Sequence, residues 1–393
     1  MPTKRRMIMD YFLTDEQREI RDLARQIAQE KIAPVAMEYD EKGEFAWEIV
    51  EILAKSDLCG VYIDEKYGGL GGGVFDLCLV TEELSKACGG IALSIAATGL
   101  GIFPVILSGS EEQKEKYLPD IASGKKLAAF AITEADAGSD VASMQTTAKK
   151  EGDYYILNGT KQWITNAGEA EIYTVIAMTD KSKGPRGASA FIVEKDFPGL
   201  SFGKKENKMG IRSSATREVI FEDCKVPKEN LFGGEGRGFM VAMKNFDHSR
   251  PGVGAQALGI AQGALDKAVQ YSKERKQFGK TISSFQGIQF MLADMATEIE
   301  AARALIYFVA KAIDSGQKGF SKESAMSKLF ASDVAMRVTV DAVQILGGYG
   351  YMKEYPVEKM MRDAKVTQIY EGTNQIQRNI IAQALIKEAA SKK

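Results

Sequence analysis

The periodicity of the apolar residues changes twice along the chain, and this change constrains the fold more than any other feature. Up to about residue 125, and again after Gly238, apolar residues recur at helical spacing, whereas residues 126–235 form short runs rich in Val, Ile, Tyr, Phe and Thr. A doubly wound sheet would show strands and helices in alternation, and this order shows none. We therefore expect an α+β multidomain chain with an N-terminal helical domain (1–125), a middle β domain (126–235) and a C-terminal helical bundle (236–393).

Local signals predict where some of these elements begin and turn. Thr14 and Gln17 have the spacing of a capping box that starts a helix, and Pro34 limits that helix. Asn158 and Gly159 stand between two apolar runs in the middle domain, and this dipeptide is typical of a tight hairpin. We therefore expect a turn there.

The last third of the chain predicts a four-helix bundle. We expect three long helices and a shorter one after Thr373, with the long ones over residues 254–274, 284–315 and 321–346. In the middle domain, residues 188–193 and 217–221 are expected to be strands.

Composition limits the chemistry that is available to the chain. The 51 basic and 53 acidic residues leave a formal net charge of −2 without a long block of one sign, so no nucleic acid is expected as a partner. His248 is the only histidine, which argues against most zinc, di-iron and Ser/His/Asp sites, and we expect no metal.

The sequence favours a cytoplasmic protein. The four cysteines stand far apart without a C-x-x-C pair, which fits free thiols in a reducing compartment. The opening twelve residues carry basic side chains without the apolar segment of a secretion signal. We also expect no run that approaches the ~18 apolar residues of a membrane span.

Two segments at the start of the middle domain could bind a planar ligand. Residues 130–140 offer hydroxyls, small residues and a flexible glycine, although an ordinary connecting loop fits equally well. Trp163 and Thr165 lie two apart and hence on one face of a strand, where an indole could contact a planar cofactor. Considered alone, a tryptophan in a strand is more often part of the core.

A charged segment interrupts the helices of the last third. Arg275 and Gln286 lie on either side of Phe278 and Gly279, which mark a break between two helices. An arginine at this position suits a phosphate, and a solvated helix end is the common alternative.

Glu371 is the candidate for acid–base chemistry. It follows Tyr370 and precedes Gly372, so that a carboxylate sits beside a large side chain in a bend. Partial desolvation would raise its pKa and make it a useful base. A capping or salt-bridged glutamate is the plainer alternative on this fragment.

Five motifs together resemble the acyl-CoA dehydrogenase family, over about residues 11–385. The motifs are T-E-x-x-A-G-S-D (133–140), W-I-T-N (163–166), E-R-K-Q-F-G (274–279), Q-I-L-G-G-Y-G (344–350) and I-Y-E-G-T (369–373). The resemblance implies an N-terminal α-helical domain, a middle β-barrel domain and a C-terminal four-helix bundle. It also implies FAD between the last two domains and a homotetramer built as a dimer of dimers.

The resemblance also implies roles for individual residues. The flavin would be lined by Phe130, Ile132, Thr133, Gly138, Ser139, Trp163, Ile164 and Thr165, the last near the reactive N5 edge. FAD of the neighbouring subunit would be contacted by Arg275, Phe278, Gln286, Gln344, Ile345, Leu346, Gly347 and Gly348, and FAD of the same subunit by Thr373, Asn374 and Gln375. The acyl-CoA would meet Ser139, Asp247, Arg250, Tyr370 and Gly372, whereas the ring of His248 is expected to be incidental.

The implied reaction is the α,β-dehydrogenation of an acyl-CoA to the enoyl-CoA, with electrons passed to an electron-transferring flavoprotein. Glu371 would take the α proton while the β hydride passes to the flavin. Some relatives carry the base at the residue before the matched arginine, which is Ser249 here, so Glu371 is the sole candidate base. An acyl-CoA oxidase, an enoyl-CoA reductase and a non-catalytic acyl-CoA-binding scaffold are the alternatives.

Substrate range is the least constrained property. Relatives that act on glutaryl-CoA place an arginine in the stretch matched by residues 89–94, which is Gly-Gly-Ile-Ala-Leu-Ser here. Together with Ala96, Ala97 and Gly99, this stretch favours a short, branched or alicyclic acyl group. Ala135 and Asp136 stand where many relatives have a proline, and the resemblance therefore predicts a less rigid flavin loop.

Overall fold

The N-terminal domain of the computed structural model is helical, as expected. The structure describes residues 11–391. Most of the opening twelve residues, in which we expect no secretion signal, therefore lie outside the described residues. Thr14 caps the first helix through the predicted box, because its hydroxyl accepts the Gln17 amide at 3.2 Å and Gln17 Oε1 accepts the Thr14 amide at 3.2 Å. The helices are α1 (Asp15–Ile27), α2 (Ala36–Lys42), α3 (Trp47–Lys55), α4 (Val74–Ala87), α5 (Gly89–Ser108) and α6 (Glu111–Ala122).

Helix α5 corrects the expectation that no run approaches the length of a membrane span. Its 20 residues carry no charge, and among the described helices it alone is long and apolar enough to cross a membrane. Most of it is buried inside the fold, where it packs against α4, α7 and β1 (Ala128–Ala131). A fully enclosed core helix loses its polar face and therefore has the same composition as a membrane helix.

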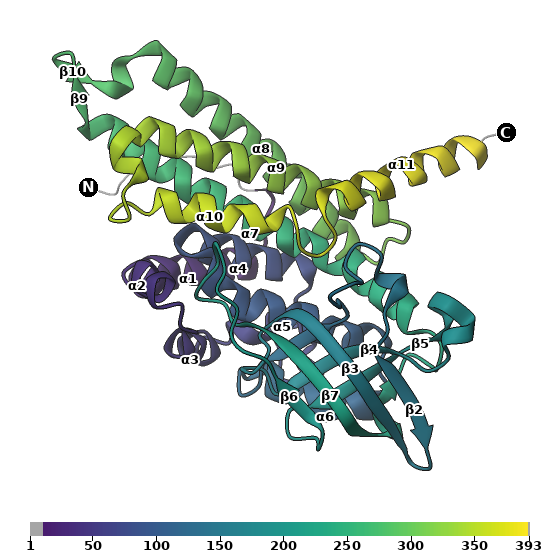
Figure 1. Cartoon of the computed structure of the whole chain (residues 1–393). Helices are drawn as coiled ribbons and strands as arrows, with labels where there is room; N and C mark the ends of the chain where they lie inside the picture. Colours follow the sequence, from purple (N-terminus) through teal and green to yellow (C-terminus); the bar gives the residue numbers. More distant parts are fainter. Residues whose placement is uncertain (1–10, 392–393) are drawn as a thin grey trace.

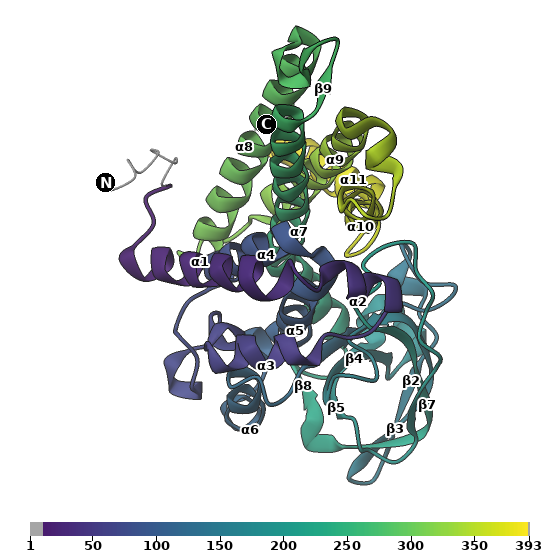
Figure 2. The same ribbon diagram turned by 90° about the vertical axis from the view of Figure 1, so that its left-hand side faces the viewer.

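The middle domain is a single eight-stranded sheet. Its strand order is β6-β7-β3-β2-β4-β5-β8, and β1 pairs in parallel with β4. Figure 2 shows how the strands curve around one another. The core between them includes Tyr155, Leu157, Tyr173, Phe191 and Phe221. The strands after β1 are β2 (Thr147–Glu151), β3 (Tyr154–Thr165), β4 (Ile172–Met178), β5 (Ala188–Glu194), β6 (Leu200–Phe202), β7 (Thr216–Pro227) and β8 (Leu231–Phe232).

The predicted turn at Asn158 and Gly159 is wrong. Both residues lie inside the continuous strand β3, where the pairing with β7 shifts register. Gly159 has φ 140°, and a Cβ there would lie 2.6 Å from Thr146 Oγ1. Asn158 Oδ1 accepts the Asp223 amide at 2.9 Å, and Asn158 Nδ2 donates to Asp223 Oδ1 at 3.0 Å. The dipeptide therefore marks a β-bulge, and the β2–β3 hairpin turns earlier, at residues 152–153.

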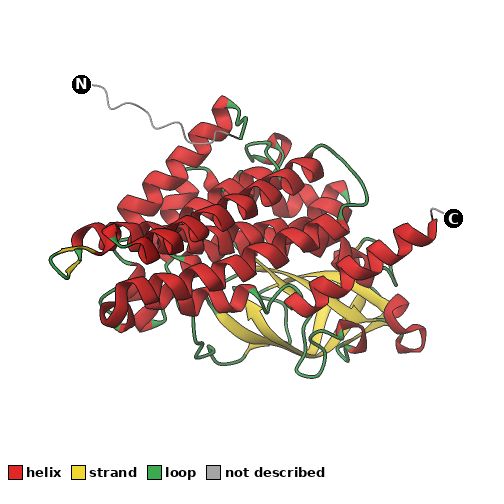
Figure 3. Ribbon diagram, turned by 90° about the horizontal axis from the view of Figure 1, so that it is seen from above, coloured by secondary structure: helices red, strands yellow, loops and turns green. Residues whose placement is uncertain are grey.

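The C-terminal domain contains the three predicted long helices. They are α7 (Gly238–Glu274), α8 (Gln286–Asp314) and α9 (Ser321–Leu346). They pack along one another, as Figures 1 and 3 show, with the sheet beneath them. The predicted short helix is α11 (Asn374–Ser391), and α10 (Val357–Thr367) was not expected.

Helix α7 begins sixteen residues earlier than the predicted start at Gly254, because Pro251 does not end it. A proline inside a helix lacks the N–H that would bond the carbonyl four residues before it, which is that of Asp247. Ser324 Oγ, from α9, donates to this carbonyl at 2.6 Å. The freed acceptor is thus satisfied by a neighbouring helix, and α7 continues through the proline.

Candidate active site

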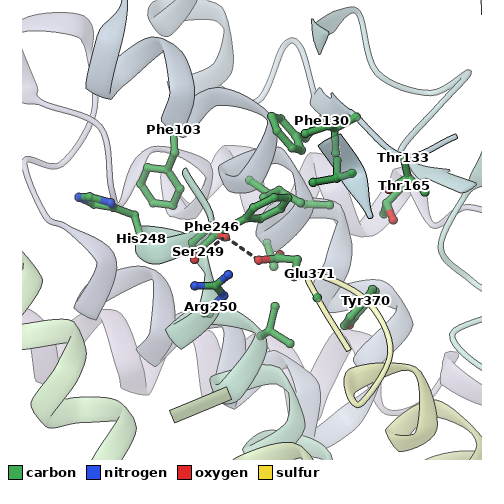
Figure 4. A pocket seen from close by; sticks show the side chains of 18 of the residues that line it. Phe103, Phe130, Thr133, Thr165, Phe246, His248, Ser249, Arg250, Tyr370 and Glu371 are labelled. Atoms are coloured by element: carbon green, nitrogen blue, oxygen red, sulfur yellow. Dashed lines mark hydrogen bonds between the residues drawn. The ribbon is translucent and has the colours of Figure 1, made fainter. Parts of the chain in front are cut away.

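A cavity of about 340 Å³ lies where the three domains meet. Figure 4 shows side chains from α5, α7, the sheet and the loop between α10 and α11 around it. Twelve of the predicted site residues line this cavity. They are Phe130, Ile132, Thr133, Gly138, Ser139, Trp163, Ile164, Thr165, Arg250, Tyr370, Glu371 and Gly372.

A second β-bulge exposes Trp163 to the cavity. The register between β3 and β7 shifts between Lys161 and Ile164, and Trp163 within this shift has φ 55°. Its side chain is 58% exposed although it belongs to a central strand. Bulges re-aim side chains in this way, so the indole forms a planar wall of the cavity rather than part of the core. The plainer interpretation of a core tryptophan does not apply.

The loop that follows β1 is held by a buried ion pair. Lys161 is fully buried, and its Nζ lies 2.8 Å from Glu134 Oε1 and donates to the Ile132 carbonyl at 3.0 Å. The other side of the Glu134 carboxylate accepts the Gln145 amide at 2.6 Å, and Oε1 also accepts the Thr146 amide at 2.9 Å. These bonds fix the residue next to Ala135, which stands where many relatives have proline. They provide a rigidity that the sequence comparison alone would not predict.

Glu371 occupies a strained turn at the centre of the cavity. Its backbone has φ 51°, a left-handed conformation that is uncommon for a residue with a side chain. The Ser249 hydroxyl donates to Glu371 Oε2 at 2.5 Å (Figure 4). Burial raises the pKa of Glu371, while the Ser249 hydrogen bond and the charges of Arg250 and Lys328 act in the opposite direction. The net effect is a pKa above the usual range of a glutamate, as the sequence predicts.

Asp247 and Arg250 lie one helical turn apart on α7 and bind one another. Arg250 Nη1 donates to Asp247 Oδ1 at 2.7 Å, and the buried Arg250 Nε has no acceptor among residues 11–391. Arg250 lines the main cavity, whereas Asp247 lines a second cavity of about 570 Å³. Met243 and His248 line both cavities, so the two cavities are neighbours along α7.

The ring of His248 is held between α7 and the segment before α9. Its Nδ1 lies 2.8 Å from the Lys244 carbonyl, and its ring packs edge-on against Phe320 at 5.1 Å. Burial lowers the pKa of the imidazole, which favours its neutral form.

The remaining predicted residues lie away from this cavity. Arg275 ends α7, about 38 Å from Arg250 at 1.5 Å per residue, and leads into the hairpin at the far end of the bundle (Figures 1 and 3). Phe278 in that hairpin is 93% exposed. The same end of the bundle carries the start of α8 and the end of α9, with Gln286, Gln344, Ile345, Leu346, Gly347 and Gly348.

Thr373, Asn374 and Gln375 begin α11 but do not line the cavity. Asn374 is buried against α9, where its side chain accepts from Lys328 Nζ at 2.9 Å and donates to Asp333 Oδ1 at 2.8 Å. Gln375 is exposed.

Sequence reasoning missed several residues that shape the site. The hydroxyl of Ser249 contacts the carboxylate of Glu371, and the hydroxyl of Tyr370 donates to Gln256 Oε1. The apolar wall contains side chains whose spacing gave no signal, because they come from different elements of the fold. They are Leu77, Leu93, Leu100, Phe103, Phe246 and Val253.

The fold and this site place a carboxylate of raised pKa against a largely apolar cavity, and the relatives that share them are oxidoreductases. Three family models match the chain: the N-terminal domain of acyl-CoA dehydrogenase over residues 14–125, the middle domain over 129–224 and the C-terminal domain over 236–386. The chain therefore belongs to the acyl-CoA dehydrogenase family, whose members are FAD-dependent.

Individual relatives agree with this assignment. The short-chain-specific acyl-CoA dehydrogenase of Megasphaera elsdenii is 51% identical over 384 residues, covering 96% of this chain and 100% of that protein. The structure of butyryl-CoA dehydrogenase from the same organism matches with a TM-score of 0.94 and 51% identity, over 96% of this chain and 100% of the other. A chain in the structure of the electron transferring flavoprotein of Acidaminococcus fermentans matches with a TM-score of 0.94 and 53% identity, over 96% of this chain and 99% of the other.

Proposed function

We propose that this chain converts a short-chain acyl-CoA to the corresponding enoyl-CoA, with Glu371 as the base, and passes the electrons to an electron-transferring flavoprotein. The observation that carries the proposal is the buried Glu371 carboxylate, which has a raised pKa and faces the apolar cavity beside Trp163 and Thr165. The relatives named for butyryl-CoA and for short-chain substrates, and the chain from the electron transferring flavoprotein structure, support the substrate and the acceptor.

The role of Glu371 follows from the acidity of a thioester. The α proton of an acyl-CoA is weakly acidic, so its removal needs a base of raised pKa and a site from which water is excluded. Apolar side chains, among them Phe130, Phe246 and Leu93, line the cavity that holds the carboxylate. Glu371 would accept the α proton, and Ser249 would keep the carboxylate oriented until it does.

A backbone donor beside the base supports the same chemistry. We find no acceptor for the Glu371 N–H among residues 11–391, although Tyr370 N–H bonds the Val366 carbonyl at 3.1 Å. An unpaired N–H at the cavity is suited to hydrogen-bond a thioester oxygen as negative charge develops on it.

The residues of the opposite wall fit FAD. A planar ring needs a flat apolar surface with hydrogen-bonding groups at its edge, and the exposed indole of Trp163 and the hydroxyls of Thr133 and Thr165 offer both. We propose that the isoalloxazine is held there by Phe130, Ile132, Thr133, Gly138, Ser139, Trp163, Ile164 and Thr165. When bound, FAD supplies the hydride acceptor of the reaction.

The far end of the bundle supports a contribution from a second subunit. Arg275, Phe278 and Gln286 are too distant to act at the cavity of their own chain, yet they expose a cation, an aromatic ring and an amide together. We propose that these residues and residues 344–348 bind the FAD phosphates and adenosine of a neighbouring subunit in a homotetramer. Thr373, Asn374 and Gln375 belong to the subunit that carries the base.

The walls of the cavity favour a short acyl group. Leu93, Ala97 and Ile211 form a separate buried cluster against Tyr370, and Leu93 and Ala97 of this cluster line the cavity on the side of α5. Gly99 contributes through packing rather than open space, since a Cβ there would lie 2.9 Å from Leu77 Cδ2.

A cytoplasmic location and the domain boundaries at residues 125 and 235 remain part of the proposal.

The test is anaerobic reduction of the bound flavin by acyl-CoAs. The purified protein is mixed with butyryl-CoA, branched, alicyclic and longer acyl-CoAs, and bleaching of the visible flavin band is followed for the parent and for Glu371→Gln. We expect bleaching by short substrates, reduced about 10²- to 10⁴-fold in the variant. A parent protein that keeps FAD but is bleached by no acyl-CoA contradicts the proposal, and rapid peroxide formation without an acceptor protein would favour an oxidase.

A further inference from the structure

Lys328 is a buried cation beside the candidate base. It lies on α9 and its side chain is fully buried. Its Nζ donates to the Gly372 carbonyl at 2.9 Å and to Asn374 Oδ1 at 2.9 Å. A buried ammonium is costly unless its donors are satisfied, and here two of the three donors bind the segment that carries Glu371.

Hydrogen bonds from two helices hold the turn that carries Glu371. Gln377 Nε2, on α11, donates to the Glu371 carbonyl at 3.1 Å and to the Gly372 carbonyl at 2.9 Å. Lys328 reaches the same Gly372 carbonyl from α9. Both carbonyls therefore point toward the bundle, whereas Glu371 itself lines the cavity.

These hydrogen bonds explain how a strained backbone conformation persists at Glu371. Glu371 has φ 51° and Gly372 has φ 87°, and a left-handed backbone is strained for a residue with a side chain unless its surroundings fix it. Asn374 links Lys328 to Ser332 and Asp333 of α9, so the anchor belongs to a rigid helix.

The charges around Lys328 also couple it to the base. The groups that face it are Glu371 in the turn, Arg250 on α7 and Asp333 on α9. Burial is the largest influence and lowers the pKa of Lys328 to about 7. In the reverse direction, the charge of Lys328 lowers the pKa of Glu371.

We propose that Lys328 is a positioning residue of the dehydrogenase, which holds the Gly372 carbonyl and thereby fixes the direction of the Glu371 carboxylate and N–H. The inference rests on the proposed role of Glu371 as base. Lys328 does not touch the reacting atoms, because it does not line the cavity. It acts through the peptide between Gly372 and Thr373, whose carbonyl it binds one residue after Glu371.

The experiment compares Lys328→Met and Lys328→Arg with Lys322→Met. Methionine keeps the length of the side chain but removes the donor, arginine restores a cation, and Lys322 on the same helix binds Glu388 at 2.6 Å away from the site. FAD content, thermal unfolding and anaerobic bleaching are measured for each holoenzyme. Infrared titration of the Glu371 carboxyl, assigned through Glu371→Gln, gives a readout independent of turnover.

The expected result is a loss of about a hundredfold in bleaching rate for Lys328→Met at retained FAD content, since a small misplacement of a catalytic group has that effect. Lys328→Arg recovers part of the rate, and KM changes less than kcat. The titration midpoint of Glu371 moves to higher pH in Lys328→Met and stays in place in Lys322→Met.

Three results would overturn the inference. One is bleaching within about threefold of the parent together with an unchanged Glu371 titration. Another is loss of folding or of FAD in both Lys328 variants, which would make Lys328 a structural residue only. The third is equal effects of Lys322→Met and Lys328→Met. If no acyl-CoA bleaches the parent, the proposed function fails by itself, and the titration still decides the role of Lys328.

Discussion

Ser249 Oγ donates a hydrogen bond to Glu371 Oε2 over 2.5 Å, and this bond joins helix α7 to the loop between α10 and α11. By resemblance, the position of Ser249 is where some relatives carry their base. Here it holds a hydroxyl that serves a base on another element. Burial is the largest influence on the pKa of Glu371 and raises it, whereas the bond from Ser249 is the largest influence that lowers it.

Ser249→Ala is expected to raise the pKa of Glu371 further, because the bond favours the charged form. A higher pKa leaves less carboxylate at acidic pH, so bleaching by butyryl-CoA falls there, by roughly tenfold for the loss of one hydrogen bond to a charged group. On the alkaline side the rate stays near that of the parent. Ser249→Thr keeps the hydroxyl and serves as the control. Superimposable pH profiles for the alanine variant and the parent would contradict this role.

The order of the domains followed from periodicity, but the irregularities of β3 did not. Helical and strand spacing are local properties, so the helical, sheet and helical regions could be predicted. The bulge at Gly159 depends on the approach of Thr146 and on the bonds between Asn158 and Asp223, which are 65 positions apart in the chain. Such a distant partner turns a dipeptide that is typical of a hairpin into an interruption inside a strand.

The same limit applies to the predicted helix start at Gly254, because α7 continues through Pro251. Ser324→Ala is expected to leave the Asp247 carbonyl without a donor and to lower the free energy of unfolding by about 1–3 kcal/mol. In Pro251→Ala the new N–H can bond this carbonyl, so Ser324→Ala should cost less in that background. The four proteins of the double-mutant cycle are compared by urea denaturation at one protein concentration. Equal costs in both backgrounds would mean that Ser324 does not replace the missing helical donor.

The sequence predicts the site residues that belong to short motifs. It does not predict those that reach the site through contacts between distant elements. Trp163, Thr165 and Glu371 stand in short motifs, and the structure brings all three to one cavity. Ser249 and Lys328 reach the base from helices far away in sequence, and no spacing rule connects them to it. Their identity became evident only from packing.

The ion pair between Glu134 and Lys161 gives a stability prediction with a defined pH dependence. Burial lowers the pKa of Lys161 to about 8 in the folded chain, below its ordinary value of 10.5. Between these values the unfolded state binds more protons, so the contribution of Lys161 to stability rises with pH through this window. Lys161→Met removes this dependence.

The same substitution leaves the Glu134 carboxylate without its cation. We expect a loss of about 3–5 kcal/mol at neutral pH and weaker FAD binding, since the loop from Ile132 to Ser139 loses its anchor. Lys161→Met combined with Glu134→Gln should recover part of the stability. Unfolding midpoints across pH and the FAD dissociation constant are the measurements. If Lys161→Met alone is as stable as the double variant, the ion pair between Lys161 and Glu134 does not hold this loop.

The preference for the length of the acyl group should depend directly on the side chain of Leu93. Leu93 lines the cavity and packs with Ala97 and Ile211 in a small buried cluster. Leu93→Ala deletes apolar atoms at this wall and makes room for additional methylene groups. Since each methylene that fits a hydrophobic pocket contributes about 1–3 kcal/mol, the ratio of kcat/KM for hexanoyl-CoA over butyryl-CoA should rise by roughly tenfold or more.

The control for this prediction is Leu79→Ala, because Leu79 on α4 is equally buried but does not line the cavity. Both variants lose stability from the deleted side chain, by about 2–5 kcal/mol. Only Leu93→Ala should change the preference between the two substrates, with FAD content matched in the assay. A preference that is unchanged in Leu93→Ala, or changed equally in Leu79→Ala, would mean that the acyl chain extends along a different wall, toward Phe103 and Leu77.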